Sequence, residues 1–229
     1  MTSPYRAALG AAFDELHPRL RAYFDAIPAG AVGRGSGVFE TVGTPRRWLW
    51  PVLAVFARSH VMFPVWEREV PFTVENRGVT APDGSPAVAA TRWFAFRSGA
   101  ATMVDEIGVR RGAVIDRLGD PVRAEARFAA TVRDGGLRLR STAVWLVVGG
   151  RRVRVPSPLA PVVVLTERWD DQHEHQRVSI TVHVPLIGRI YQYRGRFRYA
   201  IEPGGPAAQT QASRNTEAPE KRETGERSE

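Results

Sequence analysis

Apolar and polar side chains alternate through residues 122–148, on both sides of an Asp134-Gly135 pair. An alternation with a period of two is typical of a half-buried β-strand. Asp-Gly is also a preferred pair for the two-residue type I′ turn of a hairpin. The segment therefore predicts an antiparallel β-hairpin. In this register the opposed residues are Arg133 and Gly136, Val132 and Leu137, Ala130 and Leu139, Phe128 and Ser141, Ala126 and Ala143, and Ala124 and Trp145.

The rest of the chain continues the β pattern. Further strands are expected at residues 38–42, 66–75, 88–97, 101–109, 113–118, 151–155, 162–169, 177–184 and 190–201. The connections between them are too short for the crossovers that parallel strands require. An antiparallel meander of nine or ten strands must curl around a core or close into a barrel.

Three helices are expected before these strands. Ser3-Pro4 opens the first, Pro18 interrupts its apolar stripe and starts a second, and Thr44-Pro45 opens a third that runs to about Ser59. Residues 48–57 are apolar on every face, so we expect this helix to be buried, covering or plugging the sheet. The predicted fold class is α+β, with a dominant curved or barrel-like antiparallel sheet.

Composition limits the domains and the partners. Residues 204–229 contain no large apolar side chain and are expected to be disordered, which leaves one β-rich domain over residues 1–203. The net charge is +8, but the arginines are spread along the strands and Lys221 is the only lysine. We interpret them as solvent-facing side chains and do not expect nucleic acid as a partner.

A membrane is not expected as a partner either. Residues 48–57 are too few to span a bilayer, which takes about twenty apolar residues. Peripheral attachment through these residues is a third interpretation, but interfacial helices keep a strongly polar face that this segment lacks. Residues 1–15 show no secretory signal, so a cytoplasmic location is expected.

No cofactor or metal ion is expected. The chain has no cysteine, which excludes disulfides and thiolate sites. The glycines at positions 33, 35 and 37 precede a strand, so we interpret them as a flexible loop and not as a phosphate-binding turn. Residues 170–175 contain two histidines and three acidic side chains, and a polar hairpin loop is favoured there over a zinc site. No catalytic residues can be assigned.

Arg92 is the strongest candidate for a functional side chain. It shares a strand face with Phe94 and Phe96, and a buried arginine needs an anionic partner. A structural pair with Glu67 or Asp105 is favoured over a ligand. On the hairpin, small alanines beside bulky residues leave room either for core neighbours or for a ligand. The candidate ligand-binding residues are Arg92, Phe94, Phe96, Ala126, Phe128, Ala143 and Trp145.

Five groups of residues follow one another in an informative order. They are Leu16-His17-Pro18; Phe63-Pro64-Val65-Trp66-Glu67-Arg68; Arg92-Trp93-Phe94 with Ser98; Asp134-Gly135-Gly136-Leu137; and Pro185-Leu186-Ile187-Gly188 followed by Tyr193-Arg194-Gly195. In this order they resemble the bacterial family catalogued as domain of unknown function 4166. Similar domains often follow a nucleotide-binding, dehydrogenase-like domain, which implies a dehydrogenase-like protein partner. The family has no established activity, so the resemblance supplies no catalytic residues.

The preferred functional hypothesis is a non-enzymatic module that holds an apolar or amphipathic small molecule or docks to a partner protein, because curled sheets of this size commonly enclose a pocket. The alternatives are an enzyme that acts on a hydrophobic carboxylated substrate, with Arg92 as its anion anchor, and an accessory domain to a dehydrogenase-like partner.

Overall fold

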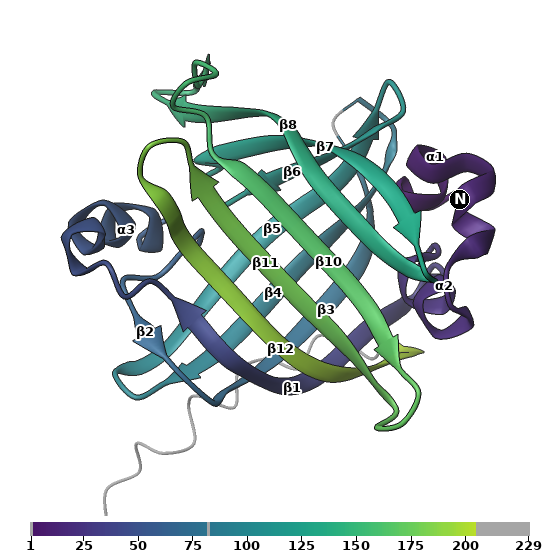
Figure 1. Cartoon of the computed structure of the whole chain (residues 1–229). Helices are drawn as coiled ribbons and strands as arrows, with labels where there is room; N and C mark the ends of the chain where they lie inside the picture. The colour runs from purple at the N-terminus through teal and green to yellow at the C-terminus, as the bar shows by residue number, and fades with distance from the viewer. Residues whose placement is uncertain (1, 82, 205–229) are drawn as a thin grey trace, which may run out of the picture.

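The fold is an antiparallel β-barrel with short helices at its two ends (Figure 1). The computed structural model describes residues 2–81 and 83–204. The helical elements are α1 (Pro4–Leu9), η1 (Gly10–Glu15), α2 (Pro18–Phe24), η2 (Arg47–Leu49) and α3 (Trp50–Ala57). The strands are β1 (Ala31–Gly43), β2 (Trp66–Glu67), β3 (Val70–Thr80), β4 (Pro86–Phe96), β5 (Gly99–Arg110), β6 (Ala113–Leu118), β7 (Ala124–Arg133), β8 (Gly136–Val148), β9 (Arg151–Arg154), β10 (Val162–Asp170), β11 (His175–Val184) and β12 (Gly188–Pro203).

Ten strands close the barrel in the order β10-β11-β12-β1-β3-β4-β5-β6-β7-β8, and a β8–β10 pairing completes the ring. The long strand β8 makes the closure possible because its two halves have different neighbours. Residues 137–140 pair with β10, whereas residues 145–148 pair with the short outer strand β9. This confirms the predicted barrel-like antiparallel fold.

The β7–β8 hairpin confirms the predicted register only in the half next to the turn. Asp134 and Gly135 have φ angles of 50° and 71°, and the pairs from Arg133–Gly136 to Phe128–Ser141 are as predicted. A β-bulge then leaves Thr142 as an extra residue on β8. Beyond it the prediction is wrong, because Ala126 lies opposite Val144 and Ala124 lies opposite Leu146.

The bulge reverses the faces to which the side chains of residues 143–148 of β8 point, relative to the prediction. Because neighbouring strand residues point to opposite faces, one extra residue moves Ala143 and Trp145 to the outside of the barrel. The Trp145 ring lies there under Arg152 of β9, 4.7 Å from its guanidinium carbon. The prediction that these two residues share the interior face with Ala126 is therefore wrong.

The N-terminal helices cover one end of the barrel, as Figure 1 shows. The Ser3 side chain accepts the Arg6 N–H at 3.0 Å and Pro4 occupies the first turn, so the predicted start of the first helix is confirmed. Pro18 begins α2, as predicted. The backbone N–H of His17 donates to the carbonyl oxygen of Gly135 at 2.9 Å, which ties the hairpin tip to this end.

Helix α3 lies at the opposite end and is less buried than the sequence predicted (Figure 1). Leu53 is 4% exposed and packs on the core, whereas Trp48, Val52 and Val55 are 60%, 55% and 61% exposed. The prediction that this helix is buried is therefore wrong for its outer side, because an eight-residue helix at the rim of a barrel presents only one side to it. In the described part of the chain, no helix has the length and apolar character needed to cross a bilayer.

Two further predictions concern glycines and the tail. The glycines at positions 33, 35 and 37 lie within β1 and not in a loop, and a Cβ atom at Gly37 would stand 2.0 Å from the Arg196 carbonyl oxygen. These glycines therefore allow β12 to approach closely.

The predicted disorder of residues 204–229 falls, from residue 205 onward, outside the described residues. Gly204 donates its N–H to the Gly30 carbonyl oxygen at 2.6 Å.

Two groups of buried side chains fill the ends of the barrel interior. One gathers aromatic residues near α3, with the Phe39 and Phe72 rings 4.0 Å apart. The other packs Phe13, Leu16 and Leu20 of the N-terminal segment against β6, β7 and β8. Members of both groups line the space that remains between them.

Candidate functional site

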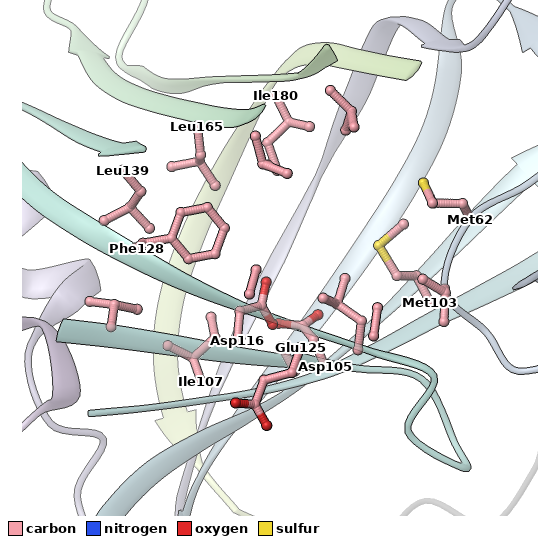
Figure 2. Close-up of a pocket in the computed structure, with 18 of the residues that line it drawn as sticks. Met62, Met103, Asp105, Ile107, Asp116, Glu125, Phe128, Leu139, Leu165 and Ile180 are labelled. Carbon is pink, nitrogen blue, oxygen red and sulfur yellow. The ribbon is translucent and has the colours of Figure 1, made fainter. Parts of the chain in front are cut away.

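A cavity of about 350 Å³ lies inside the barrel. Its walls are mostly apolar, and small side chains such as Ala90 and Ala126 leave the space open. Figure 2 shows Phe128, Leu139, Leu165 and Ile180 on one side. Small-molecule pockets in proteins occupy about 300–1,000 Å³ and combine apolar walls with a few polar groups. The cavity has the size and composition of such a pocket.

The Arg92 guanidinium forms a buried ion pair with Asp105 inside the barrel. Residue 90 of β4 lies opposite Asp105 of β5, so Arg92 stands diagonally next to Asp105 on the same face. Their side chains are 17% and 4% exposed. Burial disfavours the cation, but the charge and hydrogen bond of Asp105 act together with Tyr193 and Tyr23, and the net effect raises the pKa of Arg92. The predicted structural partner of Arg92 is therefore confirmed.

Asp116 of β6 stands beside this pair. It faces the cavity with Asp105, as Figure 2 shows. Its Oδ1 atom is buried and has no hydrogen-bond partner among the described residues. Burial raises the pKa of Asp116 well above its ordinary value, the nearby Asp105 charge adds to this, and Arg92 opposes it. An unsatisfied buried oxygen on a cavity wall is an open position for a hydrogen-bond donor.

Glu167 of β10 brings another carboxyl group to the cavity. Gln176 of β11 donates a hydrogen bond to it from Nε2. Burial raises the pKa of Glu167 to about 7, although the Gln176 hydrogen bond and the Arg92 charge both lower it. Glu167 therefore changes its charge close to neutral pH.

Asn76 of β3 adds an amide to the polar side of the cavity. Its Nδ2 donates to the Tyr199 hydroxyl at 3.4 Å, and its Oδ1 is buried with no partner in the described residues. In the register, Asn76 lies opposite residue 90, which in turn lies opposite Asp105. We call the group Asn76, Arg92, Asp105 and Asp116, which extends from β3 to β6, the interior polar belt.

The seven candidate residues from the sequence are not brought together. Arg92, Ala126 and Phe128 line the cavity. Phe94 and Phe96 share the inner face of β4 but pack in the aromatic group near α3, with ring centroids 5.5 Å apart. Ala143 and Trp145 lie on the outer face, beyond the β8 bulge.

Asp116 and Glu167 were missed by the sequence analysis. Each stands on an otherwise apolar strand face, Asp116 between Val114 and Leu118 and Glu167 between Leu165 and Trp169. An acidic residue at a core position of a period-two pattern is the signal that could have found them, because such a residue is buried only with a partner or a role.

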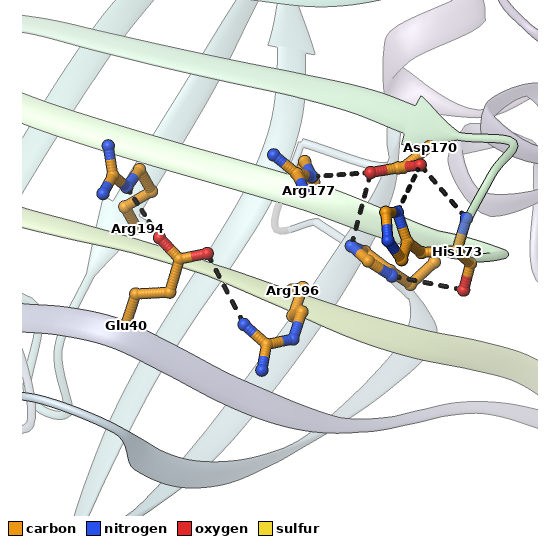
Figure 3. Close-up of polar contacts among 7 residues, drawn as sticks. Glu40, Asp170, His173, Arg177, Arg194 and Arg196 are labelled. Atoms are coloured by element: carbon orange, nitrogen blue, oxygen red, sulfur yellow. Dashed lines mark hydrogen bonds and ion pairs between the residues drawn. The ribbon is translucent and has the colours of Figure 1, made fainter.

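The outer face carries ion pairs of the kind expected for solvent-facing arginines. Figure 3 shows Glu40 of β1 between Arg194 and Arg196 of β12, with N to O distances of 2.9 and 3.6 Å. At the β10–β11 turn, Asp170 contacts the His173 ring at 3.1 Å and the Arg177 guanidinium at 2.9 Å (Figure 3). Within residues 2–81 and 83–204, no group of three or more histidine or acidic side chains is placed to hold a metal ion.

Two comparisons with known proteins match this chain. Residues 16–197, which include all four residues of the interior polar belt, match the family described as Domain of unknown function (DUF4166). The chain is also similar to the uncharacterized protein YndH of Bacillus subtilis (strain 168), with 21% identity over 188 residues that cover 80% of this chain and 90% of that protein. Because the family match extends over most of the barrel, the chain belongs to the DUF4166 family.

Proposed function

We propose that this barrel is a non-enzymatic module that binds one apolar or amphipathic small molecule in its interior. The observation that carries the proposal is the cavity of about 350 Å³, with apolar walls and a few convergent polar groups. Buried space of this kind is costly in a protein core, because the lining atoms lose packing contacts that an occupant would restore.

The main alternative, an enzyme that anchors a carboxylated substrate on Arg92, is less well supported. The Arg92 cation is already neutralised by Asp105. A substrate carboxylate would have to compete with a buried aspartate on the next strand for the same guanidinium. An accessory role beside a dehydrogenase-like protein stays a prediction.

Binding can be tested with Nile red, an uncharged dye whose fluorescence reports an apolar environment. The native protein should bind the dye saturably, with one dye per chain. Native mass spectrometry of the purified protein would show in parallel any small molecule that co-purifies with it.

Two alanines on neighbouring strands provide a matched pair of variants. Ala126 lines the cavity, whereas Ala143 lies on the outer face. Ala126→Leu should weaken dye binding about tenfold while the protein stays folded, and Ala143→Leu should leave the affinity unchanged. The proposal is wrong if the folded protein binds no dye, or if the two variants weaken binding equally.

A further inference from the structure

The cavity presents an acceptor that the chain itself does not use. Asp116 Oδ1 is buried at the cavity wall and no described residue donates to it. Leaving a buried polar atom without a hydrogen bond is unfavourable, so nearly all such atoms in proteins have a partner, from the protein, from water or from a ligand. Asn76 Oδ1, in the same polar belt, is a second unpartnered acceptor within the described chain.

The charges around the cavity also disfavour an anionic ligand. Among the described residues that line it, Arg92 is the only arginine or lysine, and it is bound to Asp105. The same lining contains five carboxyl groups, on Asp25, Asp105, Asp116, Glu125 and Glu167. Three of these have arginine partners: Asp25 pairs with Arg6, Glu125 with Arg152 and Asp105 with Arg92.

Asp116 and Glu167 have no arginine or lysine within ion-pair distance among the described residues, and only Glu167 has a donor, Gln176. A carboxylate that entered the cavity would therefore meet acidic groups and no free cation. A hydroxyl or amine would instead supply the donor that Asp116 lacks. An amine would supply the same donor, and as a cation beside Asp116 it would favour the ionised form of that carboxyl group.

We propose, on the basis of the binding function above, that the ligand of this barrel is an apolar molecule with a hydroxyl or amine head group that donates a hydrogen bond to Asp116. The apolar part lies along the walls formed by Phe128, Leu165 and Ile180, which the same cavity brings opposite the belt. Asp116 then selects the head group of the ligand, and the apolar walls bind its apolar part.

The experiment is a competition for bound Nile red with four compounds that each carry a chain of ten carbon atoms: 1-decanol, decylamine, 1-methoxydecane and decanoate. In the ether of decanol a methyl group replaces the donor hydrogen of the hydroxyl, and that hydrogen is the feature under test. Decanol and decylamine should displace the dye at concentrations about tenfold lower than the ether and decanoate, because a hydrogen bond to a buried acceptor is worth about this factor.

Variants at position 116 connect the preference to this residue. Asp116→Leu removes the acceptor and should bring the four compounds to similar displacing concentrations. Asp116→Asn, which adds an amide donor, should improve decanoate relative to decanol, and it serves as the second variant should the leucine variant fail to fold. Ile107→Val is the matched control, since residue 107 lies opposite Asp116 on β5, lines the same cavity and carries no polar group.

The outcomes separate this inference from the binding function. If all four compounds displace the dye equally from the unmutated protein, or if Asp116→Leu keeps the preference for decanol, the head-group inference is wrong and binding itself stands. Equal displacement from the unmutated protein would mean that a water molecule bound in the cavity satisfies Asp116. If the folded protein takes up neither the dye nor any of the compounds, the proposed function fails.

Discussion

Arg92 of β4 binds Asp105 of β5 with its guanidinium group inside the barrel, where both side chains are turned away from solvent. A buried ion pair of this kind is not in itself a source of stability, because its attraction has to offset the loss of hydration of both groups. It does set the net charge of this part of the cavity wall, since Asp105 neutralises the Arg92 cation.

The first prediction is that breaking this ion pair from one side destabilises the protein strongly. Asp105→Asn leaves the Arg92 cation buried without its counter-charge, so the free energy of unfolding should fall by about 3–5 kcal/mol. Urea unfolding at pH 7 measures this loss of unfolding free energy. The double variant Arg92→Met with Asp105→Leu is the control and should lose less, because no unpaired charge remains. Single and double variants of equal stability would contradict the role assigned to the pair.

The second prediction concerns the pH dependence of stability. In the folded protein the pKa of Glu167 is about 7, compared with an ordinary value of 4.5. Between these two values the folded chain holds a proton that the unfolded chain has lost, so stability falls as the pH rises, by up to about 1.4 kcal/mol per pH unit. This contribution is fully present below pH 4.5 and is lost as the pH rises through about 7.

Glu167→Gln tests this sign directly. The amide does not titrate, and its oxygen can still accept the hydrogen bond from Gln176. Relative to the unmutated protein, the variant should therefore gain in stability as the pH is raised from 4.5 to 7, measured by urea unfolding at several pH values. Asp116 has a raised pKa as well and is present in both proteins, so its effect cancels in the difference. A stability difference that does not change with pH would refute the assignment.

The barrel could be predicted from the sequence because period-two patterns and short turns act locally. The type I′ turn at Asp134-Gly135 and the helix starts at Pro4 and Pro18 depend on residues within a few positions of each other, and the structure confirms all three. The position of β1 between β12 and β3 is set by closure of the whole ring, and no local pattern predicts it.

The candidate site was harder to predict, for two physical reasons. A bulge adds one residue without interrupting the alternation that it displaces, so Ala143 was assigned to the wrong face. In addition, a single acidic residue on an apolar strand face, such as Asp116, does not reveal in the sequence which residues lie across the barrel from it, so its place at a cavity wall could not be predicted. Arg92 was identified because its strand is apolar on both sides, which made a buried charge visible in the sequence.

The third prediction tests the bulge. Ala126 and Ala143 lie on neighbouring strands, but only Ala126 faces the interior. Ala126→Arg should cost about 3 kcal/mol or more, because it places an unpaired charge against the apolar wall, whereas Ala143→Arg should change the stability by less than about 1 kcal/mol. Melting temperatures of the two variants compare the sites. Equal losses would support the register without a bulge.

The last prediction concerns α3, where adjacent residues on one short helix have opposite environments. Leu53 packs on the aromatic group near the barrel end, whereas Val52 is 55% exposed. Leu53→Asp should therefore destabilise the protein by several kcal/mol, since it buries a charge with no partner. Val52→Asp should have little effect, because the carboxylate stays hydrated at nearly the same place in the chain. Helix propensity contributes only a few tenths of a kcal/mol to such a difference, because both variants introduce the same residue and Leu and Val differ little as helix formers, so the contrast in melting temperature reports burial. If Val52→Asp destabilises as much as Leu53→Asp, the outer side of α3 is covered in solution and the exposed face seen here is occupied by another surface.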